Sequence, residues 1–125
     1  MLSYRHNHTQ ITTKDTEKAV EFYTQVMNAK ITRTQGSGNQ QTVDLDLGGI
    51  PVRVSSKTGA DDALGKRYGL HHIAFNVNDM EESIGNAKSK GVEIVVEFQP
   101  RPGVKIAFIK GPDDALFEIL EVKES

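Results

Sequence analysis

The sequence predicts an α+β fold in which one βαβββ unit occurs twice. The two halves of the chain resemble each other at a shift of 64 residues (72 − 8), both pass from a strand through an aspartate into a helix, and three short strands can follow each helix. We expect the first copy at about residues 4–58 and the second at about 68–123. Because neither copy can bury a core alone, residues 1–125 should form a single domain, with paired mixed sheets around a concave cavity and helices outside.

Six aligned pairs of residues carry the internal similarity. The shift pairs His8 with His72 and Asp15 with Asp79. It also aligns Ile11 with Phe75, Thr13 with Val77, Glu17 with Glu81 and Val20 with Ile84. Six matches in the same element order favour a true repeat over a chance pattern or a ferredoxin-like pair.

One helix is expected in each half, directly after an aspartate. Asp15 and Asp79 stand where an N-cap is needed, because an aspartate side chain accepts hydrogen bonds from amides of the first turn. The helices are predicted at about residues 16–28 and 80–90, and Gly91 suits the position just after the second helix. The apolar residues of the first helix should form one stripe that packs on a sheet: Ala19, Phe22, Tyr23, Val26 and Met27.

Short apolar and β-branched runs predict three strands after each helix. In the first half these runs lie near residues 30–34, 41–47 and 52–55, and in the second half near 93–98, 105–109 and 116–122.

Composition limits the classes of function that need to be considered. The chain has 125 residues, of which 37% are hydrophobic and 26% charged, as expected for one globular domain. It has no cysteine, which excludes thiol nucleophiles, zinc-thiolate sites and disulfides. A chain of this size can fold without a structural metal, so any bound metal is expected to be functional.

Charge and hydropathy argue against nucleic acid and membrane partners. The net charge is −2, and the Lys and Arg residues are scattered along the chain. No apolar run approaches the roughly 20 residues that a membrane span needs, and the polar first ten residues lack the apolar core of a signal peptide. The sequence therefore predicts a cytoplasmic protein.

Three residues are candidates for a metal site. His8 and His72 occupy equivalent places on the first strand of each half, so pseudo-symmetry would bring them to facing positions in one cavity. Glu118 shares a strand face with Leu116 and Leu120, where a carboxylate must find a cation or hydrogen-bond donors. Together they form a set of two histidines and one carboxylate, which suits Fe, Mn, Ni, Co or Zn. Either histidine alone would be explained more simply as a hydrogen-bonded strand residue.

The two other histidines serve as comparisons. His6 precedes His8 by two residues and should share its strand face, either as an accessory pocket residue or as a surface residue; we favour the surface. His71 alternates to the face opposite His72, towards the helix layer, and is expected to be structural.

At these residues the chain resembles the vicinal-oxygen-chelate superfamily. The resemblance rests on residues 8–15 (HTQITTKD) with the following Glu21-Phe22-Tyr23, on residues 70–79 (LHHIAFNVND) and on residues 111–121 (GPDDALFEILE). This superfamily includes glyoxalase I, the bleomycin-resistance proteins and the extradiol dioxygenases, and residues 101–108 are similar to its methylmalonyl-CoA epimerase members. The resemblance implies that His8, His72 and Glu118 are metal ligands. Glu118 could also be catalytic, as a proton carrier, if it leaves the metal during turnover. We expect a homodimer, although in this superfamily the cavity is completed either within one chain or across a dimer.

At the family's fourth metal position, this chain departs from the family pattern. Counting back 65 residues from Glu118 (118 − 65) gives Arg53, where glyoxalase I and methylmalonyl-CoA epimerase carry Glu or Gln. A guanidinium has only donors and cannot coordinate a cation. If Val52 and Val54 pack under the helices, Arg53 should face the cavity, where it could hold an anionic substrate group; otherwise it reaches from a strand edge into water.

Three functions remain open. The first is a metal-dependent isomerase or lyase of glyoxalase type that acts on a small molecule with vicinal oxygens. The second is Fe(II)-dependent ring cleavage of extradiol type. The third is a metal-free binding or resistance protein of the bleomycin-resistance type, in which Arg53 and Glu118 could meet as a buried ion pair. The candidate substrate-binding residues are Arg53, Gln10 and Asn76.

Overall fold

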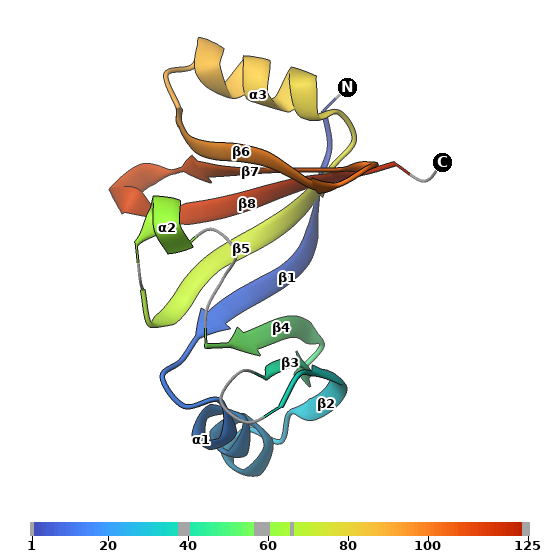
Figure 1. Ribbon diagram of the computed structural model, residues 1–125, viewed down its shortest axis with the longest axis vertical. Coiled ribbons are helices and arrows are strands. Elements are labelled where there is room, and N and C mark those ends of the chain that lie inside the picture. The colour runs from blue at the N-terminus through green and yellow to red at the C-terminus, as the bar shows by residue number, and fades with distance from the viewer. Residues whose placement is uncertain (1, 38–40, 57–60, 66, 124–125) are drawn as a thin grey trace. The chain divides into compact units, whose positions relative to one another are not determined.

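The computed structural model describes residues 2–37, 41–56, 61–65 and 67–123 (Figure 1). The chain separates into two compact units. The first-repeat unit is His8–His71, and the second-repeat unit combines Met1–Asn7 with His72–Ser125. The first-repeat unit overlaps the predicted first copy, and the second-repeat unit overlaps the predicted second copy with the first residues of the chain added; the predicted bounds and the single domain stay predictions. The predicted end of the first copy, near residue 58, lies outside the described residues.

Each unit contains the predicted strand, helix and three strands in that order, and the structure adds the short helix α2 and the turn η3, which were not predicted. The first-repeat unit contains β1 (Tyr4–Thr12) from His8 onward, α1 (Thr16–Glu21), the π-helix η1 (Phe22–Val26), β2 (Lys30–Gln35), β3 (Thr42–Leu47), β4 (Ile50–Ser55) and the short α2 (Asp61–Leu64). The second-repeat unit contains β5 (Gly69–Val77) from His72 onward, α3 (Met80–Ser89), β6 (Glu93–Arg101), β7 (Val104–Lys110), the 3₁₀ turn η3 (Pro112–Asp114) and β8 (Leu116–Val122).

The strands of each unit form a mixed four-stranded arrangement. In the first-repeat unit the order is β2-β3-β4-β1, with β1 parallel to β4 and the other pairs antiparallel. In the second-repeat unit the order is β5-β8-β7-β6, with β5 parallel to β8 and the other pairs antiparallel. The predicted α+β fold with two βαβββ copies is thus confirmed.

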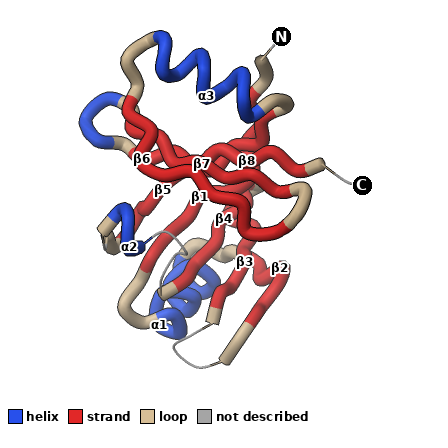
Figure 2. The backbone as a smooth tube through the Cα atoms, turned by 45° about the horizontal axis from the view of Figure 1, so that its top comes forward, coloured by secondary structure: helices blue, strands red, loops and turns tan. Residues whose placement is uncertain are grey.

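Helix α1 covers one face of the first-repeat sheet by packing on β3 and β4 (Figure 2). The buried cluster under it contains Val52 and Val54 of β4. The other members are Ala29, Val43 and Leu45, with Ile11, Ala19, Val20, Tyr23 and Leu47 packed against them.

Helix α3 packs on β6 and β8 of the second-repeat unit (Figure 1). Its core consists of Val77, Met80, Ile84, Ala107 and Ile119, with Ile94 against them.

Both helices begin at the predicted aspartates. Asp15 Oδ1 accepts from the amide of Lys18 at 3.1 Å, and Asp79 Oδ1 accepts from the amide of Glu82 at 3.0 Å. The end of α3 is followed by Gly91 with φ of +77°, a left-handed conformation that suits glycine. The aspartate signal in the sequence therefore located both helix starts.

The predicted apolar stripe of the first helix was partly wrong. Ala19 and Tyr23 do pack on the sheet, but Phe22, Val26 and Met27 are exposed. The α-helix ends at Glu21 and continues as a π-helix, whose wider turn breaks the 3.6-residue spacing that placed Val26 and Met27 in the stripe. Thr24 contributes, because its hydroxyl donates to the carbonyl of Val20 at 2.8 Å and competes with the regular helical hydrogen bond.

None of the helices in the described part of the chain is long and apolar enough to cross a membrane.

Candidate functional site

Glu118 lies on the face of the second-repeat sheet that α3 does not cover. Its neighbour Ile119 and the β7 residue Ala107 belong to the core under α3. Strand alternation therefore turns Glu118 to the opposite face, together with its register partners Phe108 on β7 and Ala74 on β5. This agrees with the prediction that Glu118 shares a face with apolar residues.

His72 and Glu118 are brought into direct contact on this face. His72 Nε2 and Glu118 Oε1 are 3.0 Å apart, and the two side chains are only 2% and 11% exposed. The ring of Phe108 stands edge-on to the His72 imidazole, with the ring centroids 5.0 Å apart. The imidazole is thus held between an aromatic ring and a carboxylate.

His72 and Glu118 are side chains that could hold a metal ion. Among the described residues, the contact with His72 is the only hydrogen bond or ion pair of the Glu118 side chain, although a buried carboxylate needs strong compensation. Two ligand atoms about 2.1 Å from one ion and at right angles to each other would lie about 3.0 Å apart, as these two do. The pair therefore fits either a proton shared between the side chains or a divalent ion.

His8 occupies the equivalent place in the first-repeat unit. It is buried, as are Gln10 and Thr12 at the next alternate positions of β1. Ile11, between them, packs towards α1 in the core. The three polar side chains consequently share the sheet face that is turned away from the helix.

Arg53 occupies the place in the first unit that Glu118 occupies in the second. Gln10 pairs in register with Arg53, just as Ala74 pairs with Glu118, and the two pairs are related by shifts of 64 (74 − 10) and 65 (118 − 53). The one-residue slip inferred from the sequence is therefore confirmed by the strand register.

Arg53 is held by an acidic partner that sequence reasoning did not identify. Its neighbours Val52 and Val54 are buried under α1, so Arg53 faces the opposite side, as predicted. Its Nε donates to Asp44 Oδ1 at 2.8 Å, and the two side chains are 39% and 25% exposed. Asp44 could have been found only from the antiparallel register of β3 and β4, which aligns the two residues. Arg53 and Glu118 thus each have a partner within their own unit.

The remaining candidates differ in burial. Asn76 is half-buried and shares the His72 face of β5, while Gln10 is fully buried on β1. His6 is exposed, with its ring edge against Phe75, which agrees with the predicted surface position. His71 is buried on the alternate face of β5, and its structural role stays a prediction.

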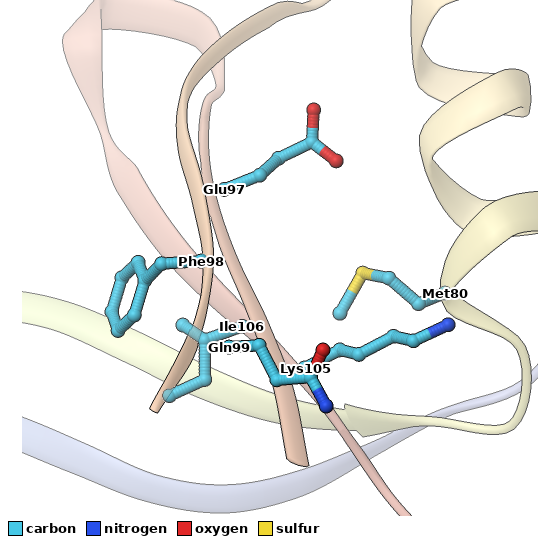
Figure 3. Close-up of a pocket in the computed structure, with 6 residues that line it drawn as sticks. All are labelled: Met80, Glu97, Phe98, Gln99, Lys105 and Ile106. Atoms are coloured by element: carbon cyan, nitrogen blue, oxygen red, sulfur yellow. The ribbon is translucent and has the colours of Figure 1, made fainter. Parts of the chain in front are cut away.

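A hollow of about 250 Å³ in the second-repeat unit lies elsewhere (Figure 3). It is lined by Met80, Glu97, Phe98, Gln99, Lys105 and Ile106. Figure 3 shows Glu97 and Lys105 on the same side of the β6–β7 hairpin as Met80, which belongs to the core under α3. Neither His72 nor Glu118 lines this hollow, so it is not part of the candidate site.

Comparison with protein families gives one match over most of the chain. Residues 5–119 match the model of the glyoxalase/bleomycin resistance protein/dioxygenase superfamily. A probable lactoylglutathione lyase from Vibrio cholerae serotype O1 is 31% identical over all of this chain and 96% of its own length. A lactoylglutathione lyase from Escherichia coli O157:H7 is 28% identical over 94% of this chain and 93% of its own length.

Two solved structures illustrate the likeness of fold. A hypothetical protein from Bacillus halodurans C-125 superposes with a TM-score of 0.70 at 24% identity, covering 98% of this chain and 97% of that chain. A methylmalonyl-CoA epimerase in complex with methylmalonyl-CoA and NH4+ gives a TM-score of 0.64 at 25% identity, covering 95% and 94%.

Proposed function

Since the chain belongs to the glyoxalase/bleomycin resistance protein/dioxygenase superfamily, we propose that it is a metal-dependent enzyme of glyoxalase type, an isomerase or lyase for a small substrate with vicinal oxygens. The observation that carries the proposal is the buried contact between His72 and Glu118 on a largely apolar sheet face. A carboxylate in this position is most simply compensated by a cation.

The proposed ligands of the ion are His8, His72 and Glu118. Each can offer one ligand atom, and all three are buried. Two imidazoles and one carboxylate suit Fe(II), Mn(II), Ni(II), Co(II) or Zn(II). Arg53 at the repeat-related fourth place has no lone pair to offer, so the proposed set has three protein ligands and leaves positions for substrate oxygens.

We assign proton transfer, orientation of the substrate and exclusion of water to side chains of this protein. A divalent ion, when bound, supplies Lewis-acid polarisation of the substrate oxygens. Glu118 moves a proton at Oε2, the oxygen that does not contact His72. The amides of Gln10 and Asn76 orient the substrate oxygens, and the ring of Phe108 excludes water from the imidazole of His72.

The named relatives support this class of reaction. Lactoylglutathione lyases align over nearly the whole chain, and a methylmalonyl-CoA epimerase shares the fold at 25% identity. We therefore propose lactoylglutathione as the first substrate to test, and a short acyl thioester as the second. The homodimer and the cytoplasmic location expected from the sequence belong to the same proposal.

The proposal is tested by assaying the chelator-treated protein with lactoylglutathione and with a methylmalonyl thioester, before and after addition of each of the five ions. Activity that appears with one ion and is lost in His72→Ala supports it. Equal activity with and without an ion, or activity that survives His72→Ala, would show that the His72–Glu118 pair is not the catalytic metal site.

A further inference from the structure

Helix α1 and the π-helix η1 form one helical segment on the first-repeat sheet (Figure 2), and both the inner and the outer face of this segment carry apolar residues. The inner face packs on the sheet through Ala19, Val20 and Tyr23. The outer face carries Phe22 and Val26, whose exposed fractions are 50% and 69%. A helix on the surface of a globular protein normally has a polar outer face, so these two side chains call for an explanation.

The exposed apolar surface extends beyond the outer face of the helical segment. Met27, directly after η1, is 48% exposed, and Ile31, on the edge strand β2, is 53% exposed. Ile31 pairs in register with Leu45, which lies in the core under α1, so Ile31 projects from the side of the sheet that carries the helix. We call Phe22, Val26, Met27 and Ile31 the apolar patch. Single exposed apolar residues are common, but four within ten positions are typical of an interaction surface.

A hollow of about 390 Å³ lies beside the ring of Phe22. It is lined by Lys18, Glu21, Phe22, Gln25 and Val26, all of which belong to the first-repeat unit. The half-exposed ring and the hollow next to it give one surface both a projecting apolar group and a recess that can receive one. Such a surface can pair with its own copy about a twofold axis, because the ring of each chain then enters the hollow of the other.

The charges beside the hollow also favour a second copy as the partner. Lys18 and Glu21 are exposed, and within the described ranges neither side chain makes an ion pair. In a twofold contact, residue i of one chain meets residue j of the other and j meets i, so Lys18 can meet Glu21 of the second chain at two equivalent places. The two charges cancel (1 − 1), which argues against a nucleic acid or an anionic membrane surface as the partner.

We propose that the apolar patch, with Lys18 and Glu21 beside it, is the surface through which two copies of this chain form a homodimer. This inference rests on the homodimer expected within the proposed function, and it names the surface that forms the dimer. The ring of Phe22 fills the hollow of the partner chain, and the rest of the apolar patch loses its contact with water. The two ion pairs between Lys18 and Glu21 fix the orientation of the chains.

Charge reversal tests this surface and its twofold pairing, with the dimer Kd measured by sedimentation equilibrium of the full chain. Lys18→Glu and Glu21→Lys, each made alone, place like charges opposite each other at both ion pairs, so each should raise the dimer Kd about tenfold or more. An equimolar mixture of the two variants should form a heterodimer, because each pair then joins a carboxylate to an ammonium group. The double variant Lys18→Glu, Glu21→Lys should dimerise as tightly as the wild type for the same reason.

Two control variants match these changes in net charge. Lys88→Glu on α3 and Glu97→Lys on β6 alter exposed residues of the second-repeat unit, so both should leave the dimer Kd unchanged. A surface ion pair contributes little to the stability of a fold, so all of these variants should keep the far-UV circular dichroism spectrum of the wild type.

Phe22→Ala tests the apolar contact independently of the charges. Because an aromatic ring that enters a recess of the partner contributes strongly to binding, the variant should raise the dimer Kd about tenfold or more. The ring is 50% exposed in the single chain, so its removal should leave the circular dichroism spectrum of the wild type intact.

The outcomes separate this inference from the metal-dependent activity. A wild type that stays monomeric at every concentration would overturn the inference together with the homodimer. An unchanged dimer Kd in Lys18→Glu, Glu21→Lys or Phe22→Ala would assign the dimer to another surface, and single charge variants that do not recover in the mixture would refute the twofold ion pairs. Native mass spectrometry of the same samples counts the bound ions, so failure of the metal site would be detected separately from failure of this surface.

Discussion

Glu118→Gln should weaken metal binding and leave the stability of the metal-free protein nearly unchanged, because Gln keeps the shape of the side chain but loses its charge. In the metal-free protein the amide can still hydrogen-bond His72, so the free energy of unfolding should change by no more than about 1 kcal/mol. An ion at a hundredfold excess over its Kd stabilises the folded state by about 2.7 kcal/mol. With an unfolding entropy of about 2.1 cal/mol/K per residue, the 125 residues give about 0.26 kcal/mol/K, so the wild-type Tm should rise by about 10 °C. In Glu118→Gln this rise should be lost.

The chain offers a matched control three residues away. Glu121 is as deeply buried as Glu118 but faces the helix side, where its Oε1 accepts from the amide of Met80 at 2.9 Å. Glu121→Gln should weaken this hydrogen bond at the start of α3 and lower the metal-free Tm by about 4 °C, which corresponds to about 1 kcal/mol. The metal-induced rise should remain. Differential scanning calorimetry with and without Zn(II) measures both quantities, and a metal-induced rise that persists in Glu118→Gln would refute the role of this carboxylate.

The other predictions address the histidines, the arginine and a helix cap. His8→Ala and His72→Ala should each abolish tight metal binding and leave the far-UV circular dichroism spectrum unchanged; an unfolded variant of a protein that never held metal would identify the histidines as core residues. Arg53→Gln restores a neutral potential ligand, so metal affinity should rise in calorimetric titration, and an unchanged affinity would place Arg53 away from the ion. Asp79→Ala removes the cap of α3 and should cost about 1 kcal/mol by thermal melting without changing metal affinity.

Local signals in the sequence were sufficient to predict the order of the strands and of the helices α1 and α3. Asp15 and Asp79 located both helix starts because an N-cap is satisfied within three residues. The strand β8 was predicted with its observed limits, Leu116–Val122, because alternation and flanking turn residues define it locally. The repeat then identified Arg53 as the counterpart of Glu118, which the strand register bears out.

Features that depend on non-local geometry could not be predicted in this way. The pairing of Arg53 with Asp44 follows from the register of two strands, and the bond from Glu121 to Met80 joins residues 41 positions apart. The π-helix after Glu21 arises from hydrogen-bond competition at Thr24, which a 3.6-residue pattern does not reveal. For this reason Val26 and Met27 were wrongly assigned to the core.

The sequence predicted His72 and Glu118 only as members of a metal site with His8, and it did not predict that their side chains touch. Alternation on β8 correctly turned Glu118 to an apolar face, and the repeat singled out His72. Their 3.0 Å separation adds the physical reason to expect an ion there, since the carboxylate has no other hydrogen bond among the described residues. The participation of His8 in the same site stays a prediction.

The most direct test of the account is the metal content of the protein as purified without added ions, followed by titration of the chelator-treated protein with Mn(II), Fe(II), Co(II), Ni(II) and Zn(II). Native mass spectrometry should find one ion per chain in the wild type and none in the double variant His72→Ala, Glu118→Gln. A wild-type protein that binds none of the five ions, or a double variant that still holds one, would contradict the central claim that these two side chains bind a catalytic metal.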